Sequence, residues 1–169
     1  MARRPRVFAP GGAYHLTARG VDDDAIFYTA FDCFALLALL RQVTERCGWT
    51  VAAWCLMHTH YHLVVVTGPD PAVSDAMHRL NGIYAREFNL RHHRRGHLFG
   101  ERYSPTSVED ERHLAAACGY VLLNPVTAGL VRSIEDWAWS GDHRLEARLT
   151  HTMDTNSLHV RDTLVRRRR

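Results

Sequence analysis

Lysine and long apolar runs are the first features that this sequence lacks. All 21 basic residues are arginines, against 18 acidic ones, so the formal net charge is only +3. No stretch reaches the roughly 18 uninterrupted apolar residues that a membrane-spanning helix requires. The segment 1–6 is basic, but the apolar core of a signal peptide does not follow it. We therefore expect a cytoplasmic protein that has no membrane segment.

Paired cysteine motifs are also missing. The sequence has no C-x-x-C spacing, and its four cysteines lie in apolar surroundings: Cys33, Cys47, Cys55 and Cys118. Buried, reduced thiols are therefore favoured over disulfides or a structural zinc site.

The length of 169 residues and a hydrophobic content of 46% fit one compact domain with a substantial core. The arginines cluster at positions 3–6, 91–95 and 166–169. Such clusters suit contacts with phosphates, although a GC-rich genome would also explain the preference for arginine over lysine. Residues 144–169 are polar and end in four arginines, which is typical of a solvated or disordered tail.

Hydrophobic periodicity predicts an α+β fold. Alternating or β-branched segments predict strands over residues 13–19, 49–56, 60–67 and 103–108. Helical spacing predicts helices over residues 29–47, from Pro71 to about residue 90, and over 109–123. The first helix should end at Gly48, and the apolar stripe of the second comprises Val73, Met77, Leu80, Tyr84 and Phe88. The order of these elements suggests a ferredoxin-like antiparallel sheet with packed helices.

His60 and His62 lie two residues apart in the predicted strand 60–67. Residues at this spacing lie on one face of a strand, so the two imidazoles would form the edge of a metal site. Neutral imidazoles suit Mn²⁺, Zn²⁺, iron or nickel better than Mg²⁺, which is possible where a substrate phosphate completes the shell. His58 has the same parity and could join the pair. The alternative is a pair of strand histidines that hold no ligand.

Tyr120 and Asn124 are four residues apart, so one helix would present the phenol and the amide on the same face. Asn124 is then the candidate for a third metal ligand, and Tyr120 is the candidate nucleophile. A divalent cation near the phenol would favour the phenolate, whose usual pKa is about 10. The alternatives are an ordinary core aromatic at position 120 and a helix C-cap at position 124, before Pro125.

A long series of short motifs accompanies these residues. In chain order it comprises Pro10, Gly11, Tyr14, His15, Leu16, Thr17, Arg19, Gly20, Leu56, Met57, His60, Tyr61, His62, Leu63, Leu80, Asn81, Tyr84, Gly96, His97, Leu98, Phe99, Arg102, Tyr103, Tyr120, Leu123, Asn124, Pro125, Val126, Ala128, Gly129, Leu130, Val131, Trp137, Trp139 and Ser140. The series resembles the HUH single-tyrosine transposases, specifically the REP-associated tyrosine transposases. The resemblance covers about residues 6–143 and implies an HUH endonuclease-type fold there.

The resemblance also implies a function. It implies cleavage of single-stranded DNA through a 5′-phosphotyrosine with release of a 3′-hydroxyl, and rejoining by the reverse reaction. The matching positions make Tyr120 the nucleophile and His60, His62 and Asn124 the ligands of Mg²⁺ or Mn²⁺. One departure is that His58 and Thr59 replace the usual Pro and Asn before the histidine pair, so His58 could compete for the metal.

The expected partner is single-stranded DNA that carries a hairpin and a flanking guide sequence, bound by a monomer or a homodimer. Arginines would contact phosphates and aromatic rings would stack on bases. The candidate DNA-binding residues are Arg19, Arg91, Arg94, Arg95, Phe99 and Arg102. Two other functions are open: a domesticated DNA-hairpin-binding protein that no longer cuts, and an unrelated metal hydrolase that uses the histidines but not Tyr120.

Overall fold

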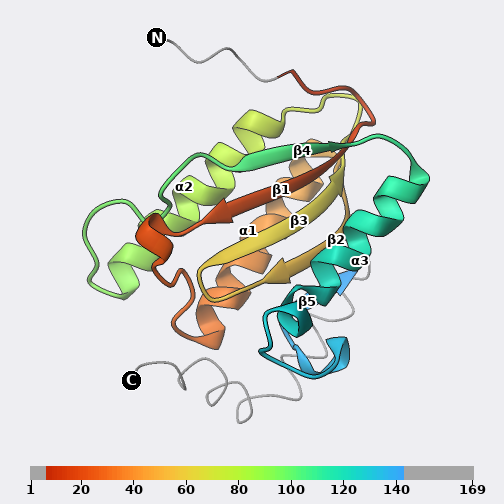
Figure 1. Ribbon diagram of the computed structural model, residues 1–169. Coiled ribbons are helices and arrows are strands. Elements are labelled where there is room, and N and C mark those ends of the chain that lie inside the picture. The colour runs from red at the N-terminus through yellow and green to blue at the C-terminus, as the bar shows by residue number, and fades with distance from the viewer. Residues whose placement is uncertain (1–6, 143–169) are drawn as a thin grey trace.

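The fold is a five-stranded antiparallel sheet with helices on both faces, seen in a computed structural model that describes residues 7–142 (Figure 1). The main elements in chain order are β1 (Ala13–Arg19), α1 (Ala30–Cys47), β2 (Thr50–Leu56), β3 (His60–Val66), α2 (Val73–Arg91), β4 (Ser104–Val108), α3 (Glu111–Thr127) and β5 (Ser140–Asp142). Two 3-10 turns, η1 (Val21–Asp23) and η2 (Ile134–Asp136), complete them. The strand order is β4-β1-β3-β2-β5, so the predicted ferredoxin-like arrangement is confirmed and β5 extends it beyond β2.

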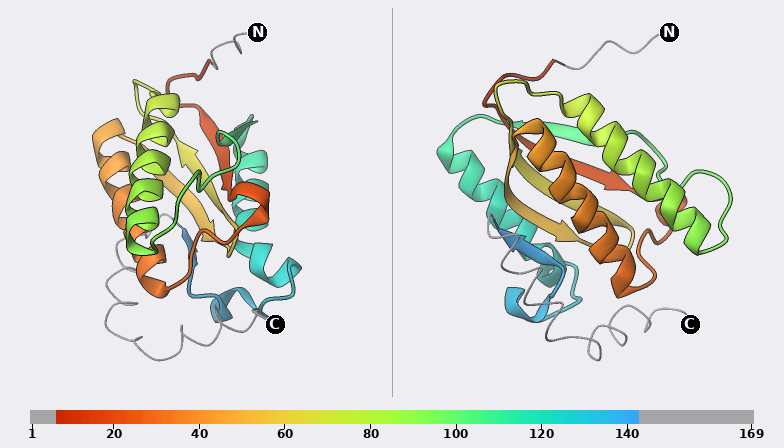
Figure 2. Two further views of the ribbon diagram at one scale, coloured as in Figure 1. Left: turned by 90° about the vertical axis from the view of Figure 1, so that its left-hand side faces the viewer. Right: turned by 180° about the vertical axis from the view of Figure 1, so that it is seen from behind.

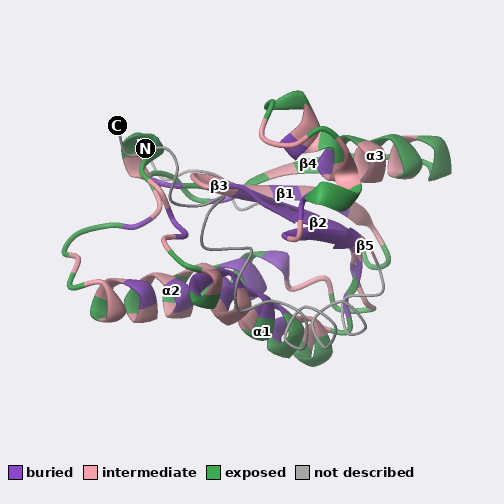
Figure 3. Ribbon diagram, turned by 90° about the horizontal axis from the view of Figure 1, so that it is seen from below, coloured by how far each residue is buried: buried purple, intermediate pink, exposed green. Residues whose placement is uncertain are grey.

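The two faces of the sheet have different coverings, which follow from the alternation of side chains along each strand. Tyr14, Leu16 and Ala18 of β1 are buried, whereas His15 and Thr17 between them are only half-buried. Helices α1 and α2 lie side by side over one face (Figure 2), and α3 lies over the opposite face (Figure 3). The main core is therefore between the sheet and the α1–α2 pair, and the face under α3 is more open.

Helix α1 has strong signals at both ends. At its start, Thr29 and Asp32 form a capping box, in which the Asp32 carboxylate accepts from the Thr29 backbone N–H at 2.9 Å. At its end, Gly48 adopts a left-handed conformation with φ of +64°, which confirms the predicted stop.

Helix α2 begins later than predicted. Pro71 lies outside the helix because Ala72, the N-cap, has a left-handed backbone with φ of +34°. The Pro71 carbonyl oxygen instead accepts from the Trp49 indole N–H at 3.1 Å. The apolar stripe from Val73 to Phe88 is buried as predicted.

Helix α3 also departs from the predicted range 109–123. It starts at Glu111 because the Asp110 carboxylate caps it, accepting from the His113 backbone N–H at 2.7 Å. It then continues through Pro125 to Thr127. Pro125 supplies no N–H donor to the helix, but the following turn is still closed by Ala128 N–H donating to the Asn124 carbonyl at 2.9 Å. Asn124 therefore lies inside the helix and is not its C-cap.

All four cysteines are free thiols, as predicted, but only Cys33 and Cys55 are fully buried. No helix within residues 7–142 has the length and apolar character needed to cross a membrane. The predicted polar tail over 144–169 and the arginines at positions 3–6 lie outside the described residues.

Candidate active site

The face of the sheet under α3 carries the histidine pair. His60 and His62 stand at the start of β3, and their ring centroids are 5.0 Å apart. In the antiparallel register with β1, His62 lies opposite Thr17 and His60 lies opposite Arg19. Tyr61 faces the other way, where its phenol donates to Asn81 of α2 at 2.5 Å. The structure thus places the two imidazoles side by side, as the strand spacing predicts.

Two side chains of β1 hold one edge of the His62 ring. His62 Nδ1 is 2.9 Å from His15 Nε2 and 3.2 Å from Thr17 Oγ1. The His15 and His62 rings are stacked, with centroids 5.1 Å apart. Neither His15 nor Thr17 was among the site residues predicted from the sequence. The parity of β1 places both on this face, but the register between β1 and β3 was needed to bring them to His62.

The other ring nitrogen of His62 is unlike Nδ1. Within residues 7–142, His62 Nε2 is buried and has no hydrogen-bond partner. On His60, Nδ1 lies 3.0 Å from Thr59 Oγ1. A buried nitrogen without a protein partner is what a metal ligand looks like before a cation binds.

Both histidines are held in the neutral form that coordinates metals. Burial, assisted by the nearby His60, His15 and Arg19, lowers the pKa of His62 to about 3. Burial and the positive charge of Arg19 lower the pKa of His60 to about 4, against the opposing effect of Asp23. At neutral pH both imidazoles are therefore uncharged, and their lone pairs can bind a cation.

Helix α3 brings Tyr120 to this pair. The Tyr120 ring meets the His62 ring edge-on, with centroids 5.9 Å apart, and it lies at the same distance from the His15 ring. The side chain is nevertheless 57% exposed. The phenol is therefore open to a large substrate while its ring rests on the histidines.

Asn124 lies one turn further along α3 and is partly buried. Its Nδ2 donates to the Tyr120 carbonyl oxygen within the same helix, at 3.5 Å, which leaves Oδ1 as a possible ligand atom. The residues 7–142 contain no cluster of three His, Cys, Asp or Glu side chains suited to a metal. Neutral imidazole nitrogens and an amide oxygen are each donor types that divalent cations accept.

His58 does not share the strand geometry of the pair. It lies in the tight turn between β2 and β3, where Met57 N–H donates to the His60 carbonyl at 2.8 Å. The His58 carbonyl accepts from the Ile26 backbone N–H at 2.9 Å. Side chains alternate only along a continuous strand, so strand parity does not extend to His58, and its part in the site stays a prediction.

Several predicted DNA-binding arginines have acidic partners in the chain. Arg91 pairs with the buried Asp32, and its guanidinium lies 4.6 Å from the centre of the Phe31 ring. Arg94 Nη2 lies 2.9 Å from a carboxylate oxygen of Asp24.

The other three arginines of the predicted set are exposed. Arg19 pairs with Asp23 at 2.5 Å on the surface, and Arg95 and Arg102 are exposed to solvent. The predicted set therefore divides into two groups. Arg91 and Arg94 make ion pairs within the fold, whereas the other three are exposed and could contact a partner.

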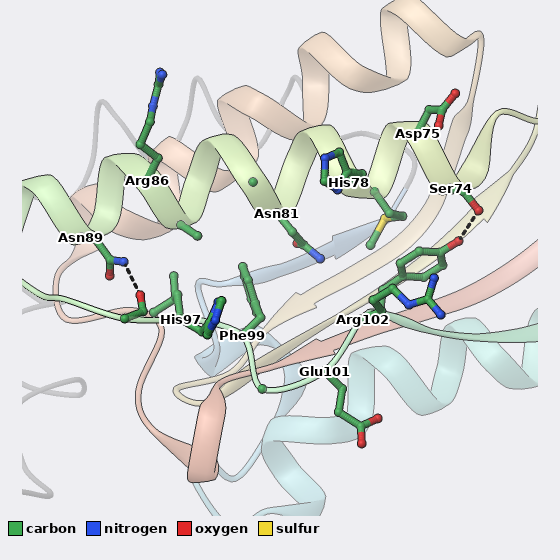
Figure 4. A pocket seen from close by; sticks show the side chains of 17 residues that line it. Ser74, Asp75, His78, Asn81, Arg86, Asn89, His97, Phe99, Glu101 and Arg102 are labelled. Carbon is green, nitrogen blue, oxygen red and sulfur yellow. Dashed lines mark hydrogen bonds between the residues drawn. The ribbon is translucent and has the colours of Figure 1, made fainter. Parts of the chain in front are cut away.

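Phe99 and Arg102 line a groove of about 900 Å³ between α2 and the segment 96–103 (Figure 4). Asn81 from α2 and Phe99 from the facing segment extend toward each other across it. Hydrogen bonds join the walls near both ends: Asn89 Nδ2 donates to the Gly96 carbonyl at 2.9 Å, and Ser74 Oγ is 3.1 Å from Tyr103 Oη. The groove is therefore a defined surface feature, with polar groups and the rings of Phe99 and Tyr103 along its walls.

Comparisons with known proteins agree with this arrangement. Residues 11–123 match the family model described as "Transposase IS200 like". A curated protein of Haemophilus influenzae, named as a putative REP-associated tyrosine transposase, is 23% identical over 154 residues, which is 85% of this chain and 87% of that protein. A solved structure of a REP-associated tyrosine transposase bound to a REP hairpin superposes with a TM-score of 0.69 at 19% identity, covering 88% of this chain and 87% of the other. At that identity the superposition shows a shared fold.

Proposed function

The chain belongs to the IS200-like transposase family, and from this premise we propose that it cleaves and rejoins single-stranded DNA beside hairpins through a phosphotyrosine on Tyr120. The observation that carries the proposal is the exposed Tyr120 ring resting on the buried His62. A tyrosine that is open to solvent yet held against neutral imidazoles can reach a phosphate and a cation together. An ordinary core aromatic would be buried.

The reaction is a transesterification at phosphorus. Tyr120 Oη attacks a phosphodiester, the bond from phosphorus to the 3′-oxygen breaks, and a 5′-phosphotyrosine forms. The phenol proton is lost, and the departing 3′-oxygen takes up a proton to become a hydroxyl. Attack by a DNA 3′-hydroxyl reverses these steps and reseals the strand, because the covalent intermediate retains the energy of the original ester.

His60, His62 and the Oδ1 of Asn124 would hold the divalent cation, Mg²⁺ or Mn²⁺. The unpartnered Nε2 of His62 and the low pKa values of both histidines support this assignment. When bound, such a cation would withdraw charge from the phosphate and favour the phenolate. The protein itself would hold Tyr120 against the site through the rigid helix α3.

The DNA partner we propose is a hairpin with a single-stranded flank, by analogy with the related structure that holds a REP hairpin. The exposed Arg95 and Arg102 would contact phosphates, and Phe99 in the groove would contact an unpaired base. Arg91, by contrast, is already paired with a buried carboxylate and would stabilise the fold.

Incubation of the full-length protein with flanked hairpin DNA and Mn²⁺, followed by a denaturing gel, tests the proposal. We expect a covalent protein–DNA adduct that Tyr120→Phe abolishes. Tyr28→Phe, at a ring that packs against Phe88 and His92 at the end of α2, should still form it. An adduct in Tyr120→Phe would refute the nucleophile, and hairpin binding without any adduct would favour a non-cleaving binding protein.

A further inference from the structure

The arrangement around His62 Nδ1 is a closed triangle of polar atoms. His15 Nε2 lies 2.9 Å from His62 Nδ1, Thr17 Oγ1 lies 3.2 Å from the same nitrogen, and Thr17 Oγ1 lies 3.4 Å from His15 Nε2. All three side chains come from adjacent antiparallel strands, with Thr17 directly opposite His62. The β-branched threonine has few rotamers, so the strand pairing fixes this geometry before any ligand arrives.

The three polar atoms determine which ring nitrogen of His62 carries the proton. Two neutral imidazole nitrogens at hydrogen-bond distance share one proton, which sits on either His62 Nδ1 or His15 Nε2. If His15 Nε2 carried it, the proton of His62 would be on Nε2, which is buried and has no acceptor within residues 7–142. An unpaired buried group costs about 1–3 kcal/mol whether it is an N–H or a lone pair, but a bound cation can satisfy only the lone pair. A site that binds a cation through Nε2 therefore needs the proton on His62 Nδ1, where both His15 Nε2 and Thr17 Oγ1 can accept it.

We propose that His15 and Thr17 are positioning residues that hold His62 in its Nδ1–H tautomer, so that the Nε2 lone pair is presented to the cation. The inference rests on the proposed function for the identity of that ligand. Metal-binding histidines commonly donate their second ring N–H to a fixed acceptor, which sets both the tautomer and the orientation of the ring. Here a second imidazole and a hydroxyl on the neighbouring strand fill that role.

His15 also packs against Tyr120, so packing and hydrogen bonding must be separated. His15→Phe keeps an aromatic ring of similar shape next to His62 and Tyr120 but removes the acceptor. His15→Gln removes the ring but returns an acceptor at a similar reach. The hydroxyl of Thr17 can be treated in the same way with Thr17→Val and Thr17→Ser. These pairs distinguish a hydrogen-bonding role from a purely structural one.

Nitrogen NMR of the full-length, metal-free protein with labelled histidine rings measures the tautomer of each ring directly. The signal that is missing in His62→Gln belongs to His62. We expect the His62 proton on Nδ1 in the wild type. His15→Phe should move population to the Nε2–H form and weaken Mn²⁺ binding about tenfold to a hundredfold. His15→Gln should restore both, and Thr17→Val should cause a smaller loss that Thr17→Ser avoids.

The proposal is overturned if wild-type His62 carries its proton on Nε2, or if a folded His15→Phe leaves both tautomer and Mn²⁺ affinity unchanged. If His15→Phe does not fold, the wild-type spectrum and the comparison of Thr17→Val with Thr17→Ser decide the question. The tautomer is read without DNA, whereas the proposed function is tested by the adduct. If the wild type has the Nδ1–H tautomer but forms no adduct, the proposed DNA cleavage is contradicted. The positioning role of His15 and Thr17 is not.

Discussion

At the scale of single residues, the histidines of the site should make stability depend on pH. The folded pKa values of His60 and His62 are about 4 and about 3, below the value of about 6.5 for an unfolded chain. At pH values between the folded and the unfolded pKa, the two imidazoles are protonated in the unfolded chain but not in the folded one. The contribution is therefore present above about pH 6.5 and is lost as the pH falls toward the folded pKa values of about 4 and about 3. Burial lowers the pKa of His15 in the same direction.

We predict that the unfolding temperature of the metal-free protein falls markedly between pH 7 and pH 4.5. Scanning calorimetry in the presence of a chelator measures this change. A His60→Gln, His62→Gln double variant should show a shallower dependence over the same range, because glutamine does not titrate. An equal slope in both proteins would show that these two imidazoles are not held neutral by the fold.

At the scale of elements, the start of α1 is tied to the end of α2 through one buried carboxylate. Asp32 is fully buried, caps its own helix, and accepts from Arg91 and from His92 Nε2 at 2.9 Å. This arrangement makes Arg91 part of the fold although it was predicted to contact DNA.

Arg91→Met should lower the free energy of unfolding by about 1–3 kcal/mol, because a buried charge loses a hydrogen bond while His92 remains. Arg95→Met is the matched control: Arg95 is exposed, so stability should change by less than about 0.5 kcal/mol. Urea unfolding of the two variants measures both values. A larger loss in Arg95→Met than in Arg91→Met would contradict the role of the Asp32 network.

Helix α3 is the element whose stability should matter most for catalysis. Only Val121 and Pro125 of this helix are fully buried, and the Asp110 cap holds its first turn. Asp110→Ala should weaken the helix by about 1 kcal/mol, whereas Asp110→Asn keeps a good cap.

Hydrogen exchange should therefore show faster opening of α3 in Asp110→Ala than in Asp110→Asn, together with slower adduct formation by Tyr120. Exchange in β1 and β3 should be unchanged in both variants. If α3 exchanges equally fast in the two variants, the cap does not control the helix that carries Tyr120.

Local signals explain which elements could be predicted. The alternation over Ala13–Arg19 and the glycine at position 48 act within a few residues, and both predictions were confirmed. Strand β5 could not be predicted because three residues carry no pattern. It forms by pairing with the edge of β2, where Gly141 lies opposite Trp54, and a Cβ at Gly141 would come within 2.8 Å of the Trp54 indole nitrogen.

The candidate site was predictable to the same extent. Strand geometry alone places His60 and His62 on one face, because they are two residues apart. Helix geometry does the same for Tyr120 and Asn124, which are four residues apart. The triangle with His15 depends on the pairing of strands 47 residues apart in sequence, and spacing does not encode that register. The ion pair of Arg91 likewise joins two helices whose contact is set by the tertiary fold.

At the scale of the whole molecule, the sheet separates two surfaces. Tyr120 of α3 lies against His62 of β3 on one side, and the groove with Phe99 and Arg102 is bounded by α2 (Figure 4). Helices α3 and α2 cover opposite faces of the sheet (Figure 3). With a net charge of only +3, DNA affinity should come from a few exposed arginines.

Binding of single-stranded hairpin flanks should therefore weaken with salt, and Arg102→Ala should reduce the slope of log affinity against log salt by about 0.7, the value for one lost phosphate contact. Arg46→Ala, at an exposed arginine of α1 outside the groove, should leave the slope unchanged. Fluorescence anisotropy at several salt concentrations measures this. Equal slopes for wild type and Arg102→Ala would show that Arg102 in the groove makes no contact with a DNA phosphate.

The covalent intermediate gives the most direct test of the whole account. The adduct formed with flanked hairpin DNA and Mn²⁺ is digested with protease and nuclease, and the modified peptide is sequenced by mass spectrometry. We predict a nucleotide joined through its 5′-phosphate to Tyr120, with a free 3′-hydroxyl on the released fragment. A phosphate on any other residue, or a 3′-linked nucleotide, would contradict the account.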